Sequence, residues 1–161
     1  MPSAAQERTT RFPSRHGGPA ASPASGEETT QDLEIINILM LDDDVELADT
    51  LKLLLESRNF VVTTARNGVE GLREAMAMDF DVIICDMMMP TMPGDMFYLA
   101  VKKVKPHLCP RFLFVTGNGD DPRTNDFLQR SDGLVVFKPV PSDELLQMIS
   151  LVLQRNARQQ H

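Results

Sequence analysis

Five short runs of apolar and β-branched residues alternate along the chain with segments of helical character. The runs span residues 35–41, 60–65, 81–85, 111–116 and 134–137, and their length and composition predict buried strands. Helices are predicted over residues 45–57, 69–78, 95–104, 122–129 and 141–155, of which the fourth is short and polar. Strands that alternate with helices favour an α/β fold in which helices cover both faces of a parallel sheet.

The order of these elements predicts a flavodoxin-like, doubly wound sheet of five parallel strands with five helices. The expected strand order is 2-1-3-4-5, in which the first and third strands are neighbours. Ligands bind such sheets beyond the carboxyl ends of the strands, at the point where the strand order reverses. The residues that follow the first and third apolar runs are therefore the first candidates for a functional site.

Polar residues at the predicted helix starts support these boundaries. Asp44 is the expected N-cap of the first helix, and Ser142 is the expected N-cap of the last. Asn67 and Glu70 have the spacing of a capping box at the start of the second helix.

Acidic residues end both of the runs that meet at the predicted switch point. Asp42 and Asp43 follow the first run, and Asp86 follows the third. Three carboxylates gathered at one edge of a sheet repel one another unless a cation or a proton relieves them. Oxygen ligands of this kind suit Mg²⁺ better than they suit softer metals. The sequence therefore predicts a Mg²⁺ site.

Two further strand ends supply a hydroxyl group and an ammonium group. Thr116 ends the fourth run, and Lys138 follows the fifth. A phosphorylated aspartate requires a carboxylate nucleophile, a metal to offset phosphoryl charge, a hydroxyl donor and a cation. The same edge of the predicted sheet offers all of these groups.

These residues resemble the receiver domains of two-component response regulators, in the chemotaxis-regulator-like superfamily. The resemblance covers residues 35–157 and takes in the segments that carry the chemistry. The matching motifs are Leu41-Asp42-Asp43-Asp44, Asp86 with Met89-Pro90 and Gly94 after it, Val115-Thr116-Gly117, and Lys138-Pro139.

The resemblance implies that Asp86 is the phosphoacceptor in a Mg²⁺-dependent phosphorelay. Asp42, Asp43 and Asp86 would bind the metal together with the backbone carbonyl of Met88. Thr116 and Lys138 would contact the phosphoryl group, and the Lys138-Pro139 peptide bond would be cis.

The expected partners are a sensor histidine kinase or a phosphotransfer protein and an unidentified downstream protein. No separate turnover substrate is expected. The signal would leave by phosphorylation-dependent docking, with a surface running from the fourth helix to the fifth. The chain stops soon after its last predicted helix, which favours a single-domain regulator or a receiver related to those of hybrid kinases.

One departure from the family pattern keeps a second interpretation open. Receivers commonly carry Tyr or Phe three residues before the lysine, where this chain has Val135. A pseudo-receiver that binds partners without phosphorylation is therefore an alternative. A haloacid-dehalogenase-like phosphatase would match Asp42 and Asp44, but it leaves Asp86 without a role and needs a later acidic cluster that the sequence lacks.

Composition divides the chain into a tail and one domain. Residues 1–34 are rich in Pro, Gly, Ser and Ala and predict a disordered tail, residues 35–157 form the receiver domain, and residues 158–161 are the C-terminal end. The formal net charge is −7 and no basic stripe is present, which argues against direct nucleic-acid binding.

The sulfur-containing residues do not suggest a metal site. Cys85 and Cys109 lack zinc-site spacing and fit a reducing compartment, so a cytoplasmic location is expected. The methionines at 87–89, 92 and 96 could suggest copper(I), but packing explains them better because methionine fills irregular gaps in a core. No run approaches the length of a membrane span, so no membrane association is expected.

Overall fold

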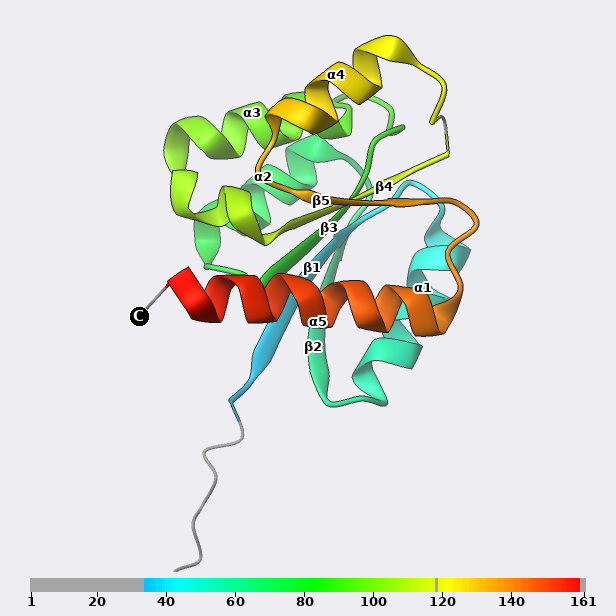
Figure 1. Cartoon of the computed structure of the whole chain (residues 1–161). Coiled ribbons are helices and arrows are strands. Elements are labelled where there is room, and N and C mark those ends of the chain that lie inside the picture. The colour runs from blue at the N-terminus through cyan, green and yellow to red at the C-terminus, as the bar shows by residue number, and fades with distance from the viewer. Residues whose placement is uncertain (1–33, 118, 160–161) are drawn as a thin grey trace, which may run out of the picture. The chain divides into compact units, whose positions relative to one another are not determined.

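A five-stranded parallel sheet organises the computed structural model, which describes residues 34–117 and 119–159. The strands are β1 (Ile36–Leu41), β2 (Phe60–Ala65), β3 (Val82–Asp86), β4 (Phe112–Thr116) and β5 (Leu134–Phe137). They lie in the order β2-β1-β3-β4-β5, and every neighbouring pair is parallel (Figure 1). The predicted flavodoxin-like topology is confirmed. The predicted disordered tail lies outside the described residues except for Glu34.

Helices follow each of the five strands. They are α1 (Val45–Glu56), α2 (Gly68–Ala77), α3 (Gly94–Val104), α4 (Pro122–Arg130) and α5 (Ser142–Gln159). A short 3-10 helix, η1 (Pro106–Arg111), adds a sixth helical segment where the sequence predicts a loop. No helix within the described ranges is long and apolar enough to cross a bilayer.

The last helix differs from its prediction at both ends. Ser142 is the first helical residue and not the N-cap, and the helix continues to Gln159 beyond the predicted end at Arg155. Its C-terminal half is anchored to η1, because the side chains of Arg155 and Asn156 both donate hydrogen bonds to the carbonyl of Pro110. This tertiary contact lies outside the apolar periodicity from which the end was predicted.

The caps of the first two helices follow the sequence more closely. The Asp44 carboxylate accepts from the Leu47 N–H at 3.1 Å, and the Asn67 side chain accepts from the Glu70 N–H at 2.9 Å. Glu70 departs from the reciprocal capping box, because its carboxylate accepts from the Arg66 N–H and not from that of Asn67.

Two hydrophobic cores cover the two faces of the sheet. One contains residues of α2, α3 and α4, including Ala75, Phe97, Tyr98 and Leu128. The other contains residues of α1 and α5, including Leu55 and Ile149. Figure 1 shows α1 and α5 on one side of the sheet, with α2, α3 and α4 on the other. This arrangement leaves the carboxyl ends of the central strands open for a site.

Candidate functional site

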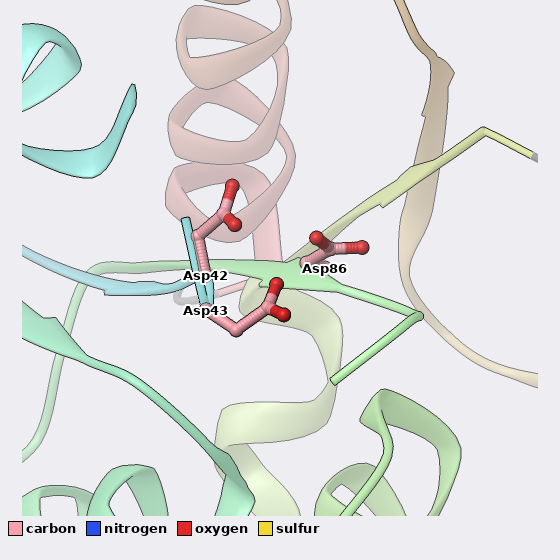
Figure 2. Close-up of side chains that lie close together, drawn as sticks. All are labelled: Asp42, Asp43 and Asp86. Carbon is pink, nitrogen blue, oxygen red and sulfur yellow. The ribbon is translucent and has the colours of Figure 1, made fainter. Parts of the chain in front are cut away.

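The register between β1 and β3 brings the three predicted acids together. Leu41 pairs with Cys85, so the residues that follow them, Asp42 and Asp86, lie next to each other at the carboxyl edge of the sheet. Figure 2 shows Asp42 and Asp43 where β1 ends and Asp86 where β3 ends. One carboxylate oxygen from each of the three lies within 4.8 Å of the others.

This group has the chemistry of a Mg²⁺ site. Asp86 and Asp42 are buried, at 3% and 8% exposure, whereas Asp43 is exposed and gives the cluster an open side. Burial is the main reason that the pKa of Asp42 lies above its usual value, and the charges of Asp86 and Asp43 add to the shift. The hydrogen bond that the Asp44 N–H donates to the Asp42 carboxylate lowers this pKa and so opposes the upward shift. A hard cation would relieve this repulsion through oxygen ligands.

Lys138 is the cation that meets Asp86. Its Nζ lies 2.9 Å from Asp86 Oδ2, while Asp86 Oδ1 accepts from the Met88 N–H at 3.0 Å. Burial by itself would lower the pKa of Lys138, but the hydrogen bond and charge of Asp86, with smaller contributions from Asp42 and Asp43, raise it. The Asp86 carboxylate is thus held by one backbone donor and one ammonium group.

Thr116 and the Lys138-Pro139 peptide bond lie at the same carboxyl edge of the sheet. Thr116 is the last residue of β4 and is 1% exposed, and its carbonyl accepts from the Lys138 N–H at 2.9 Å. This bond fixes the chain of β5 beside β4 where Lys138 leaves the sheet. The Lys138-Pro139 peptide bond is cis, as the resemblance implies.

The loop after Asp86 is held by contacts that the sequence motifs only partly indicate. The Met87 N–H donates to the Val115 carbonyl at 3.1 Å, and the Gly94 N–H donates to the Met87 carbonyl at 3.3 Å. A Cβ at Gly94 would lie 2.6 Å from the Asp86 carbonyl oxygen, so only glycine allows this approach. Met87 and Met89 are each 6% exposed and belong to the core, which supports packing for these methionines.

An apolar cavity beside the acids has no counterpart in the sequence motifs. It has a volume of about 450 Å³ and lies between α1 and α5. Leu47 and Leu51 of α1 face Val140 and Leu145 across it, and Asp86 and Lys138 line it as well. The sequence motifs identify the polar residues that line it, but its apolar walls combine residues from both ends of the domain and could not be predicted.

The comparison with known families decides the assignment. A family model, the response regulator receiver domain, matches residues 38–150, which is most of the chain. The chain belongs to the response regulator receiver domain family. The strand order and the carboxylate cluster of this receiver domain agree with the resemblance that its motifs suggest.

Similar proteins include regulators and a kinase. The transcriptional regulatory protein CpxR homolog of Haemophilus influenzae is 31% identical over 120 residues, covering 74% of this chain and 51% of that protein. The hybrid signal transduction histidine kinase D of Dictyostelium discoideum is 31% identical over 123 residues, covering 76% of this chain and 8% of that protein. The receiver domain thus spans about half the length of the first relative and a small part of the second.

Solved receiver structures agree in fold. A CheY-like receiver domain from Methanospirillum hungatei has a TM-score of 0.71 and 26% identity, over 78% of this chain and 98% of that one. A receiver domain from Clostridium thermocellum has a TM-score of 0.69 and 30% identity, over 76% of this chain and 98% of that one. The receiver domain is therefore a two-component signalling module.

Proposed function

We propose that this receiver domain accepts a phosphoryl group on Asp86 from a sensor histidine kinase or a phosphotransfer protein. The observation that carries the proposal is the position of Asp86. Its carboxylate is buried, lies within 4.8 Å of two other carboxylates and is 2.9 Å from the ammonium of Lys138. An environment of metal-binding carboxylates and an ammonium group suits a carboxylate that accepts and later loses a phosphoryl group.

In the proposed reaction, an oxygen of Asp86 forms a bond to phosphorus. The bond from phosphorus to the imidazole nitrogen of a phosphohistidine, or to the acyl oxygen of a small acyl phosphate, breaks at the same time. The leaving atom keeps the bonding electrons, and the product on Asp86 is a mixed anhydride. The domain itself would carry out only this transfer and the later hydrolysis.

The groups around Asp86 have separate roles in this proposal. Asp42, Asp43, Asp86 and the backbone carbonyl of Met88 would hold Mg²⁺, which supplies positive charge against the phosphoryl oxygens. Lys138 would move its hydrogen bond from the carboxylate to a phosphoryl oxygen as negative charge moves outward. Thr116 would donate from its hydroxyl to another phosphoryl oxygen.

Intact-mass measurement after incubation with acetyl phosphate and Mg²⁺ tests the proposal. The wild-type mass should rise by one phosphoryl group, and Asp86→Asn should abolish the gain. Asp95→Asn is the matched control, because Asp95 lies in the first turn of α3 outside the carboxylate cluster and should leave the gain unchanged. An undiminished gain in Asp86→Asn would refute the assignment of the acceptor.

A pseudo-receiver is the second candidate because of Val135. This residue packs partly buried against the core that contains α3 and α4, where the family commonly has an aromatic ring. A wild-type protein that folds and binds Mg²⁺ yet gains no mass, from acetyl phosphate or a phosphorylated kinase, would favour this candidate.

The phosphatase alternative receives no support from the site. Asp44, the second acid of its motif, serves as the N-cap of α1. Asp143 and Glu144 lie in the first turn of α5 and do not belong to the acidic cluster of the described residues, which consists of Asp42, Asp43 and Asp86.

A further inference from the structure

A groove between α3 and α4 combines an apolar surface with positive charge. Its volume is about 340 Å³, and α3 and α4 lie on the same side of the sheet (Figure 1). The lining residues are Tyr98, Leu99, Lys102, Arg123, Asp126, Phe127, Arg130 and Ser131. None of them belongs to the carboxylate cluster around Asp86.

The apolar part of the groove consists of exposed aliphatic side chains on α3 beside aromatic rings that are buried or half-buried. Tyr98 is only 2% exposed, and its ring meets Phe127 edge-on with the centroids 5.5 Å apart. Phe127 also meets Phe114 edge-on. Leu99, by contrast, is 50% exposed, and Met96, one turn earlier on α3, is similarly exposed. An aliphatic side chain of a partner would therefore find an exposed apolar contact here.

The charged residues of the groove are mostly basic. Three cations, Lys102, Arg123 and Arg130, face one acid, Asp126, so the lining carries a net charge of +2. Asp126 is paired with Arg130 at 3.2 Å. The Asp121 carboxylate accepts from the Arg123 backbone N–H at 3.2 Å, but in the described part of the chain no carboxylate forms an ion pair within 4.0 Å of the side-chain charge of Lys102 or Arg123. The chain as a whole has a net charge of −7, so this groove is a local positive site on an acidic protein.

We propose that the α3–α4 groove binds an acidic, amphipathic helical segment of a partner protein. Arg123 and Arg130 lie seven residues apart on α4, which is about 10 Å along the helix axis. Carboxylates at positions i and i+7 of a bound helix have the same separation, and residues i+3 and i+4 lie between them on the same face. Leucines at those two positions would contact Leu99, in the manner of helix-in-groove recognition.

Nucleotides fit this groove less well than an acidic peptide does. A base would need an exposed aromatic face on which to stack. The Tyr98 ring is buried, and the Phe127 ring is already engaged edge-on by Tyr98 and Phe114. Among the large hydrophobic residues that line the groove, Leu99 is exposed whereas Tyr98 is buried and Phe127 is half-buried, which favours a peptide.

This inference does not rest on phosphorylation of Asp86. The groove is already formed in the unmodified chain, and it lies on the side of α4 that faces α3. It is thus separate from the surface toward α5 on which phosphorylation-dependent docking is expected. The variant Asp86→Asn should bind the peptide like the wild type, so the two proposals can fail independently.

Fluorescence anisotropy of the full chain with a synthetic labelled peptide tests the inference. The peptide carries Glu at i and i+7 and Leu at i+3 and i+4 of a helix-forming sequence. We expect saturable binding that weakens as salt is added, and about tenfold weaker binding after Lys102→Glu or Arg123→Glu. Leu99→Asn should weaken binding at any salt concentration, because it removes the apolar contact.

Arg73→Glu is the matched control for the charge reversals. Arg73 is exposed on α2 outside the groove, and its replacement changes the net charge by the same amount. Equal weakening by Arg73→Glu, or equal binding of a scrambled peptide, would show that the peptide is held only by nonspecific electrostatic attraction. Either result would overturn the inference. Absence of binding to the wild type, or displacement of the peptide by ATP at equimolar concentration, would also overturn it.

Discussion

The ammonium of Lys138 lies 2.9 Å from the carboxylate of Asp86, across the edge of the sheet from β5 to β3. The side chain of Asp86 is 4% exposed and that of Lys138 is 36% exposed, so solvent screens only one partner well. In the state without Mg²⁺, Lys138 is thus the group that compensates the buried charge of Asp86. The positive charge of Lys138 therefore partly offsets the repulsion among the acids of the site.

Lys138→Met should therefore destabilise the metal-free protein. We expect a loss of about 1–2 kcal/mol in the free energy of unfolding, below the cost of breaking a fully buried pair because water reaches Lys138. Urea denaturation measures this loss. In the double variant with Asp86→Asn much of the loss should disappear, because the buried carboxylate to which Lys138 donates is then absent.

Lys52→Met provides the comparison. Lys52 forms an exposed pair with Glu56 at 3.9 Å on α1, and its removal should change stability by well under about 1 kcal/mol. Equal losses for the two lysine variants would show that the Lys138–Asp86 pair has no special role in stability.

Mg²⁺ should stabilise the fold through the acidic cluster. At a free concentration of 100 times Kd, binding to the native state alone adds about 2.7 kcal/mol. Asp43→Ala should remove most of this gain with little disturbance of the core, because Asp43 is exposed. Differential scanning fluorimetry with and without Mg²⁺ measures the shift in Tm. A full shift in Asp43→Ala, matching that of Asp49→Ala on the exposed side of α1, would contradict the ligand assignment.

Tyr98 should make the protein sensitive to alkali. Burial raises the pKa of Tyr98 to about 12 from its ordinary 10.0, although the Asp132 N–H, which donates to its oxygen, opposes the shift. Because the folded pKa is the higher one, stability is intact below pH 10 and is lost as pH rises toward 12. The loss should reach about 2–3 kcal/mol, at roughly 1.4 kcal/mol per pKa unit.

Ultraviolet absorbance reads this titration directly, because Tyr98 is the only tyrosine and the chain has no tryptophan. The native protein should show a phenolate transition near pH 12, and the urea-unfolded protein should show one near 10. Tyr98→Phe should remove the excess alkaline loss of stability seen in urea titrations. A native transition at the unfolded value would show that the ring is not shielded.

The sequence predicts most of the sheet and its site because both depend on local signals. Apolar runs of strand length locate β1 and β3, and the alternation of strands and helices predicts the strand order that brings Asp42 to Asp86. The end of α5 and the presence of η1 could not be predicted in this way. They depend on contacts of Arg155 and Asn156 with Pro110, which lies some 45 residues away in sequence. The Lys138–Asp86 hydrogen bond, in contrast, follows from the predicted strand order, which places β3 and β5 on either side of β4.

The proposed phosphorylation of Asp86 would change the surface mainly through the segment that follows Thr116. Val135 is β-branched and has few χ1 choices, so it is a poor substitute for a ring that changes position when Thr116 moves. The nearest exposed aromatic ring on β5 is that of Phe137, which is 53% exposed. A Cβ at Gly119 would lie 3.1 Å from this ring, so the segment after Thr116 packs closely against Phe137.

We therefore expect beryllofluoride, which mimics the phosphoryl group on Asp86, to act mainly on residues 116–131. This range contains α4, whose N-cap Asp121 closely follows Thr116 in sequence. Hydrogen exchange with and without beryllofluoride should show the largest change there, with smaller changes in β5 and α5. Gly119→Ala, which crowds Phe137, should reduce the change in α4. A Cβ at Gly117 would make an ordinary contact with the Lys138 side chain at 3.9 Å, so Gly117→Ala should reduce the change less. Changes confined to β5 and α5, with residues 116–131 unaltered, would show that the signal leaves the site by another route.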